Sequence, residues 1–172
     1  MNKIIAAIKS YFKPQETQVD MLRYRTHKMG YMLCFLAIIC DCVGFAFIYS
    51  TITAVDVFNG LDIIFNILFM LFTFLVAEQV KVYNVKASYA ALVLGGLEIG
   101  HLFWYPTVLF AAGNLSNSVY VLNVICMITA GASLIIAGIA NLFRGTILHN
   151  YLNELAKTDE SAKLELQHKE EK

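Results

Sequence analysis

Long runs of apolar residues, interrupted by few polar positions, fill the chain from about residue 29 to residue 143. A membrane-spanning helix needs about 20 mostly apolar residues, because the hydrocarbon core is ~30 Å thick and a helix rises ~1.5 Å per residue. Four stretches meet this requirement, at about residues 31–53, 57–80, 87–105 and 119–143. They are continuously apolar and lack the alternation of a membrane β-barrel, so we expect helices.

The segments between these stretches predict how the helices are connected. Pro106 lacks a backbone N–H and disfavours helix in the residue before it, so we expect the third span to end at Tyr105. The uncharged residues 106–118 are then a loop, and the other two connections are short. Short connections favour antiparallel neighbours. The pattern therefore predicts an all-α integral membrane protein, a bundle of four transmembrane helices with up-down-up-down topology.

Polar segments flank this bundle and divide the chain into three parts, residues 1–28, 29–143 and 144–172. In the first part, residues 1–13 predict a short amphipathic helix lying in the headgroup layer, with the apolar side chains of Ile4, Ile5, Ile8, Tyr11 and Phe12 on one side. The last part favours a polar helical tail that continues the fourth span.

Composition and charge narrow the class of protein further. The chain is 58% hydrophobic and 15% charged, against about 25% charged residues in soluble domains. Between Met29 and Phe143 the charged residues are few: Asp41, Asp56, Asp62, Glu78, Lys81, Lys86 and Glu98. This distribution excludes a soluble domain, and without a larger basic patch it also excludes a nucleic-acid binder.

All thirteen Lys and Arg residues fall in three segments: before the first span, between the second and third, and after the fourth. The other two connections have none. Because cytoplasmic loops carry an excess of Lys and Arg, we expect a multi-pass membrane protein with both termini in the cytoplasm.

A few polar side chains interrupt the apolar spans, and they form the candidate site. Such residues are costly in the bilayer and usually face the bundle interior or a water-filled cavity. The candidates are Asp41 on the first span, Asp62 and Asn66 on the second, Glu98 and His101 on the third, and Asn123 on the fourth.

Depth along the helices suggests which of these side chains meet. Counted from the predicted cytoplasmic ends, Asp41 and Glu98 lie about 15 and 16 Å deep and His101 about 20 Å deep. We therefore expect these three residues to meet, either to handle protons or cations or as a structural acid–histidine pair. Asp62 lies high enough to be wetted instead, and Asn66 and Asn123 suit hydrogen bonding between helices.

Small residues on two spans predict close helix packing. Gly96 and Gly100 form a GxxxG pair on the third span, and Ala130 and Ala137 lie on one stripe of the fourth. Such small residues allow the backbones of neighbouring membrane helices to approach each other.

Metal and haem binding remain as alternatives on the same residues. Glu98 and His101 have the Glu-x-x-His spacing of bundled di-iron sites, but the chain has one copy where such sites need two. A single metal ion held by Glu98, His101 and Asp41 stays open. Haem with two histidine ligands requires a second membrane histidine from another chain. No cofactor is predicted.

The sequence carries no soluble-type catalytic motif, which favours a non-enzymatic role. Our first functional hypothesis is a small accessory or structural subunit of a membrane protein assembly. The alternative is an ion- or proton-coupled transporter or channel protomer, and a second alternative is a metal- or haem-binding redox protein. The expected partners are the lipid bilayer and either other membrane subunits or further copies of this chain.

Overall fold

The computed structural model describes residues 26–52 and 57–170, with side chains described as far as Lys157. Four helices make up this part of the chain, and it contains no strand. They are α3 (Lys28–Thr51), α4 (Val57–Lys81), α5 (Val85–Ala111) and α6 (Asn117–Glu170). The amphipathic helix expected at residues 1–13 lies outside the described residues.

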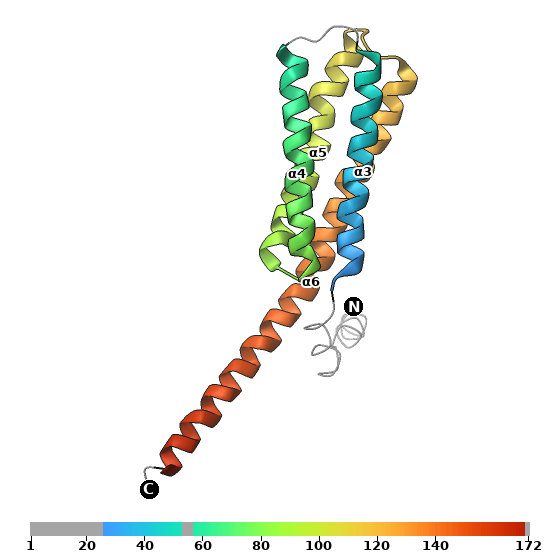
Figure 1. Cartoon of the computed structure of the whole chain (residues 1–172). Coiled ribbons are helices and arrows are strands. Elements are labelled where there is room, and N and C mark those ends of the chain that lie inside the picture. Colours follow the sequence, from blue (N-terminus) through green and yellow to red (C-terminus); the bar gives the residue numbers. More distant parts are fainter. Residues whose placement is uncertain (1–25, 53–56, 171–172) are drawn as a thin grey trace, which may run out of the picture. The chain divides into compact units, whose positions relative to one another are not determined.

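Residues His27–Phe143 form one compact unit, and the residues from Arg144 onward belong to a second unit. Within the first unit α3, α4, α5 and the first part of α6 lie side by side as a bundle (Figure 1). Helix α4 packs against both α3 and α5. The all-helical class predicted from the sequence is therefore confirmed.

On each of the four helices, one series of buried positions repeats at spacings of three or four residues. On α3 the series is Gly30, Cys34, Ala37, Asp41, Gly44 and Ile48, and on α6 it is Asn123, Met127, Ala130, Leu134, Ala137 and Asn141. This is the spacing of helices that pack almost parallel to one another, with one seam of each facing the bundle centre.

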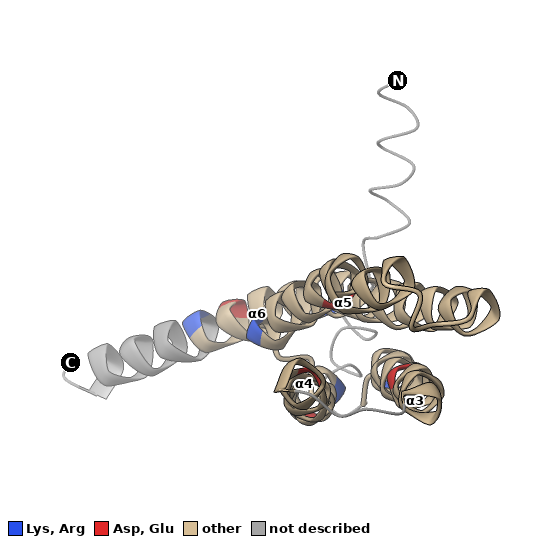
Figure 2. Cartoon of the chain, turned by 90° about the horizontal axis from the view of Figure 1, so that it is seen from above, with Lys and Arg blue, Asp and Glu red and all other residues tan. Residues whose placement is uncertain are grey.

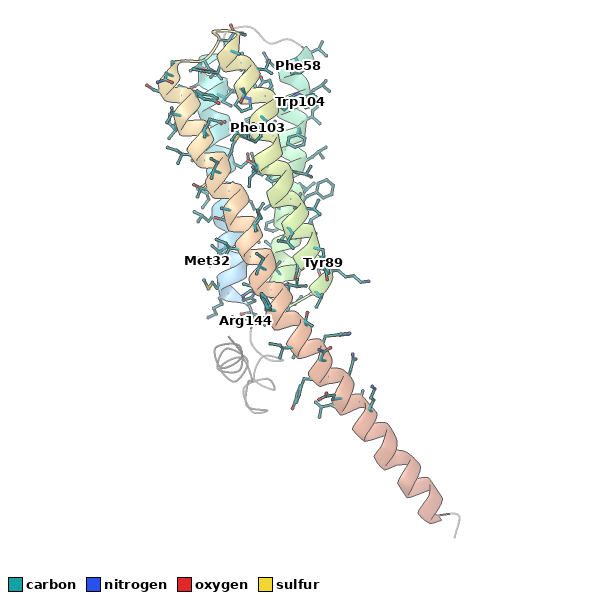
Figure 3. The ribbon with its side chains drawn as sticks, turned by 180° about the vertical axis from the view of Figure 1, so that it is seen from behind. Met32, Phe58, Tyr89, Phe103, Trp104 and Arg144 are labelled. Atoms are coloured by element: carbon teal, nitrogen blue, oxygen red, sulfur yellow. The ribbon has the colours of Figure 1, made fainter. Side chains whose placement is uncertain are left out.

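Small and polar side chains fill these seams, whereas large apolar side chains point outward. Ala37, Ala77, Ala91 and Ala130 are fully buried, yet many Phe, Leu and Ile side chains are exposed. Figure 2 shows few charged residues on the bundle helices, and Figure 3 shows large side chains projecting from them. A surface this apolar is unsuited to water. All four helices are long and apolar enough to cross a membrane, which indicates a multi-pass membrane protein.

Helix α5 does not end at Tyr105, as the sequence led us to expect, but continues through Pro106 to Ala111. Proline cannot donate the hydrogen bond that the Leu102 carbonyl would otherwise accept. The Thr107 hydroxyl donates to that carbonyl instead, at 2.9 Å. A neighbouring side chain therefore satisfies the backbone group that proline leaves unpaired, as is common in membrane helices. The resulting extension carries α5 beyond the point where the loop was expected.

The close helix contact of α5 is made by Gly95 and not by the predicted pair, Gly96 and Gly100. A Cβ atom on Gly95 would lie 2.8 Å from the carbonyl oxygen of Gly131 on α6, whereas a Cβ on Gly96 or Gly100 meets nothing within 4 Å. The GxxxG pair thus faces open space within this chain, one helical position away from the seam. Ala130 and Ala137 are fully buried in the seam of α6.

Candidate functional site

Asp62 is the centre of a hydrogen-bond network that joins three helices. Its Oδ1 lies 2.7 Å from Nε2 of His101 on α5. Its Oδ2 accepts hydrogen bonds from the Tyr49 hydroxyl on α3 at 2.9 Å and from the Asn66 side-chain amide at 3.0 Å. The side chains of Asp62 and His101 are 7% and 10% exposed, so the pair is largely removed from solvent. Charge-assisted hydrogen bonds of this kind are among the strongest in proteins.

The network continues toward the 52–57 end of the bundle through Tyr105 and Asn59. The Tyr105 hydroxyl donates to the Asn59 side-chain oxygen at 2.5 Å. The Tyr49 hydroxyl lies 3.0 Å from the Asn59 carbonyl as well as 2.9 Å from Asp62. Because a tyrosine hydroxyl has one hydrogen, it donates to one of these two oxygens at a time. Tyr49 can therefore alternate between the carboxylate and the backbone.

A small cavity of about 10 Å³ lies between the helices beside Asp62 and His101. All four helices contribute to its lining, which consists of Asp41, Phe45, Ile48, Tyr49, Asp62, Asn66, His101, Pro106, Asn123 and Met127. Three lining residues have a buried polar atom without a hydrogen-bond partner in the described part of the chain, namely Asp41 Oδ2, Asn123 Oδ1 and His101 Nδ1. A polar cavity of this size accommodates about one water molecule, which would complete these hydrogen bonds.

A larger groove of about 460 Å³ lies on the other side of the pair, between α4 and α5. Its lining is aromatic and aliphatic apart from Asp62 and His101: Phe58, Leu61 and Phe65 from α4, and Gly96, Leu97, Gly100, Trp104 and Tyr105 from α5. The volume is in the usual range of small-molecule sites. Only Asp62 and His101 line both spaces, so the pair forms their common wall.

Charge is unevenly distributed in the bundle interior. Asp41, Asp62 and Glu98 are buried there, and His101 is the only basic side chain that contacts one of them among the described residues. Glu98 is 0% exposed, and neither of its carboxylate oxygens has a hydrogen-bond partner in the described ranges. Isolated buried charge is expensive, so these carboxyl groups cannot all be ionised at once without a large cost in stability.

The structure brings most of the predicted polar residues together but pairs them differently. Five of the six predicted side chains line the small cavity: Asp41, Asp62, Asn66, His101 and Asn123. His101 pairs with Asp62 and not with Asp41 or Glu98, which corrects the pairing inferred from depth. Depth along a helix says nothing about which neighbour a side chain faces. Asp62 is 8% exposed as a residue and is therefore buried in the bundle.

Sequence reasoning missed three participants, Tyr49, Tyr105 and Asn59. Tyrosines near the ends of spans are common at membrane interfaces, so their position in the sequence does not by itself indicate a role inside the bundle. One signal was available. Asn59 and Tyr105 continue the three-and-four spacing of the seam positions on α4 and α5, where a side chain faces the bundle and not the lipid.

The described residues contain no group of three or more His, Cys, Asp or Glu side chains arranged to hold a metal ion. In particular, Glu98, His101 and Asp41 do not form such a set. The geometry therefore lends no support to the metal-binding alternative drawn from the Glu-x-x-His spacing.

Comparisons of the chain with protein-family models, with curated proteins and with solved structures found no match. The class that the fold defines is a small multi-pass membrane protein.

Proposed function

We propose that this protein moves protons or couples to their movement across the membrane, with the Asp62–His101 pair as the group that takes up and releases the proton. The observation that carries this proposal is the position of the pair. It is largely buried, it is hydrogen-bonded at 2.7 Å, and it forms the common wall of a polar cavity and an open groove. Ionisable residues inside a membrane bundle commonly mark proton or ion pathways.

Buried polar side chains along the whole bundle support a pathway through it. In chain order they are His27, Asp41, Asn59, Asp62, Asn66, Thr73, Ser88, Glu98, Asn123, Ser133 and Asn141. Small apolar residues would fill the same seam positions at no insertion cost. The presence of costly polar groups on all four helices therefore favours conduction over packing alone.

The chemistry at the pair follows from its contacts. In the tautomer that has its hydrogen on Nε2, His101 donates to Asp62, and Nδ1 is then the atom that exchanges a proton. Asp41 lines the same small cavity, so one water molecule in it would bridge Nδ1 to the Asp41 carboxyl group. Tyr49 and Asn66 hold the Asp62 carboxylate in place during the exchange.

We also propose the orientation and topology that the charges favour. All basic residues fall in segments that an up-down-up-down arrangement places on one side. The positive-inside rule then assigns that side, and both termini, to the cytoplasm.

Proton flux in proteoliposomes tests the proposed function. Purified protein is reconstituted with a trapped pH-sensitive dye, and a potassium diffusion potential drives proton entry. We expect faster acidification than in protein-free vesicles, and a loss of roughly 10²-fold in Asp62→Asn and His101→Gln, the usual effect of removing a positioned proton-transfer group. Glu78→Gln is the matched control, because this carboxyl group is 40% exposed and pairs only loosely with Lys81 at 3.4 Å.

Two results would overturn the proposal. One is a wild-type rate equal to that of protein-free vesicles, and the other is undiminished flux in both variants. Either result would favour our first hypothesis, an accessory or structural subunit, which gentle detergent extraction and mass spectrometry would then support by recovering a reproducible membrane partner.

A further inference from the structure

The groove between α4 and α5 combines an apolar wall with one acidic group at its base. Phe58, Phe65 and Trp104 supply aromatic surface, and Asp62 and His101 are its only ionisable side chains apart from Tyr105. Figure 3 shows Phe58 and Trp104 near the same end of the bundle. The exposed fractions of Phe58 and Trp104, 47% and 66%, show that the groove is open toward the outside of the bundle.

We infer that this groove binds a lipophilic cation, a molecule with an apolar body and a single positive charge such as a substituted ammonium or phosphonium. Aromatic faces attract cations, most strongly where water is excluded. When His101 is neutral, the Asp62–His101 pair has a net charge of −1, which complements such a ligand. An anion would be repelled by the same carboxylate, and a neutral molecule would leave the charge unbalanced.

Two glycines make room for the ligand. Gly96 and Gly100 line the groove, and a Cβ atom on either would meet nothing within 4 Å. In the sequence this pair predicted close packing of helices, but in the structure it widens a space beside Asp62. Glycine at these two positions therefore leaves the groove wide, and it is not required for any close helix contact within the described part of the chain.

Binding and protonation compete in this arrangement. A proton added to the pair gives protonated His101 beside the Asp62 carboxylate, with a net charge of zero, and the attraction for the ligand is lost. The cation therefore binds as one proton leaves, a one-for-one exchange of positive charge. The other titratable side chains of the packed helices near Asp62 are Asp41 and Tyr49 on α3 and Glu98 and Tyr105 on α5, and α6 has no charged side chain between Asn117 and Phe143. This inference rests on the proposed function and names the class of molecule that is coupled to the proton.

Trp104 provides a direct readout, because it is the only tryptophan in the chain and it lines the groove. Tetraphenylphosphonium is titrated into the purified full-length protein in nanodiscs while tryptophan fluorescence is recorded. We expect saturable quenching, with an apparent affinity that rises by up to ~10-fold per pH unit where the pair loses its proton. Asp62→Asn should weaken binding by at least ~10-fold, the equivalent of one lost charge contact, whereas Glu78→Gln should bind as the wild type does.

A second pair of variants keeps the test decisive if Asp62→Asn fails to fold. Gly100→Leu places a side chain in the groove from a position where a Cβ meets nothing within 4 Å, and it should abolish quenching with thermal stability retained. Gly60→Leu is the matched control, since a Cβ there also meets nothing within 4 Å but Gly60 does not line the groove.

Three outcomes would overturn the inference: no saturable quenching in the wild type, equal quenching by neutral triphenylphosphine oxide, or unchanged binding in Gly100→Leu. The proton-flux assay separates this failure from failure of the proposed function. Flux without cation binding removes the lipophilic cation alone, and binding that depends on Asp62 without any flux removes proton movement alone.

Discussion

Gly95 and Gly96 are adjacent in sequence, and the structure predicts that the same substitution has opposite effects at the two positions. A Cβ atom on Gly95 would lie 2.8 Å from the Gly131 carbonyl oxygen, 2.8 Å from Cγ1 of Ile135 and 3.2 Å from the backbone nitrogen of Ile135. Two of these three atoms belong to backbone, so they cannot move aside without shifting α6. A Cβ atom on Gly96 meets nothing within 4 Å.

The expected magnitudes follow from these contacts. Gly96→Ala should stabilise the fold by up to ~1 kcal/mol, because alanine is the better helix former. Gly95→Ala has the same gain in helix propensity but overpacks the contact between α5 and α6, which typically costs ~1–3 kcal/mol and more where backbone must shift. Because the gain in helix propensity is common to both, the two variants should differ in the free energy of unfolding by the overpacking cost, about 1–3 kcal/mol, with Gly95→Ala the less stable.

Thermal unfolding in detergent, followed with a thiol-reactive dye, measures this difference. Cys34 is fully buried and Cys126 nearly so, hence both react only as the bundle opens. Cys42 is exposed and Cys40 is half-buried, so both are replaced by alanine in every variant to remove their signal from the folded state. Gly100→Ala should behave like Gly96→Ala, since its Cβ also meets nothing. If Gly96→Ala proves less stable than Gly95→Ala, the GxxxG pair is the packing contact after all and our assignment of the α5–α6 interface is wrong.

Two further predictions concern the helix extension and the orientation. Thr107→Val should lower the stability of the fold by about 1 kcal/mol, the value of one intramolecular hydrogen bond. In a Pro106→Ala background the same substitution should cost nothing, because residue 106 then has an N–H that donates to the Leu102 carbonyl. Equal losses of stability in both backgrounds would contradict this account of α5. For the orientation, single cysteines are introduced at Lys3 or Asn114 in a cysteine-free chain, and intact cells are treated with a membrane-impermeant maleimide. We expect labelling at position 114 only. Labelling at position 3 would reverse the assignment.

The apolar pattern of the sequence predicts where most of the membrane helices begin and end. Helices α3 and α4 cover the predicted segments to within a few residues. The length of an apolar run is a local property that any bilayer must match, so it can be counted directly from the residues. The end of α5 could not be counted in this way, because the rescue of the Leu102 carbonyl by Thr107 depends on a side chain whose effect the proline rule does not include.

In the candidate site, too, the sequence identifies the residues but not their partners. Asp41, Asp62, Glu98 and His101 were identifiable because each is costly within an apolar span. Their partners were not, since the direction in which a side chain faces depends on the rotation of each helix about its axis. His101 therefore meets Asp62, and the tyrosines at the helix ends join the network.

By itself the sequence determined that this protein is an all-helical membrane bundle with acidic groups and one histidine inside it, because hydrophobicity and charge are properties of each residue and its near neighbours. Only the tertiary structure decided that Gly95 and not Gly96 packs against α6, that Asp62 is the partner of His101, and that this pair separates a polar cavity from an aromatic groove. These outcomes depend on the rotation and offset of one helix against another, which many residues on several helices set together.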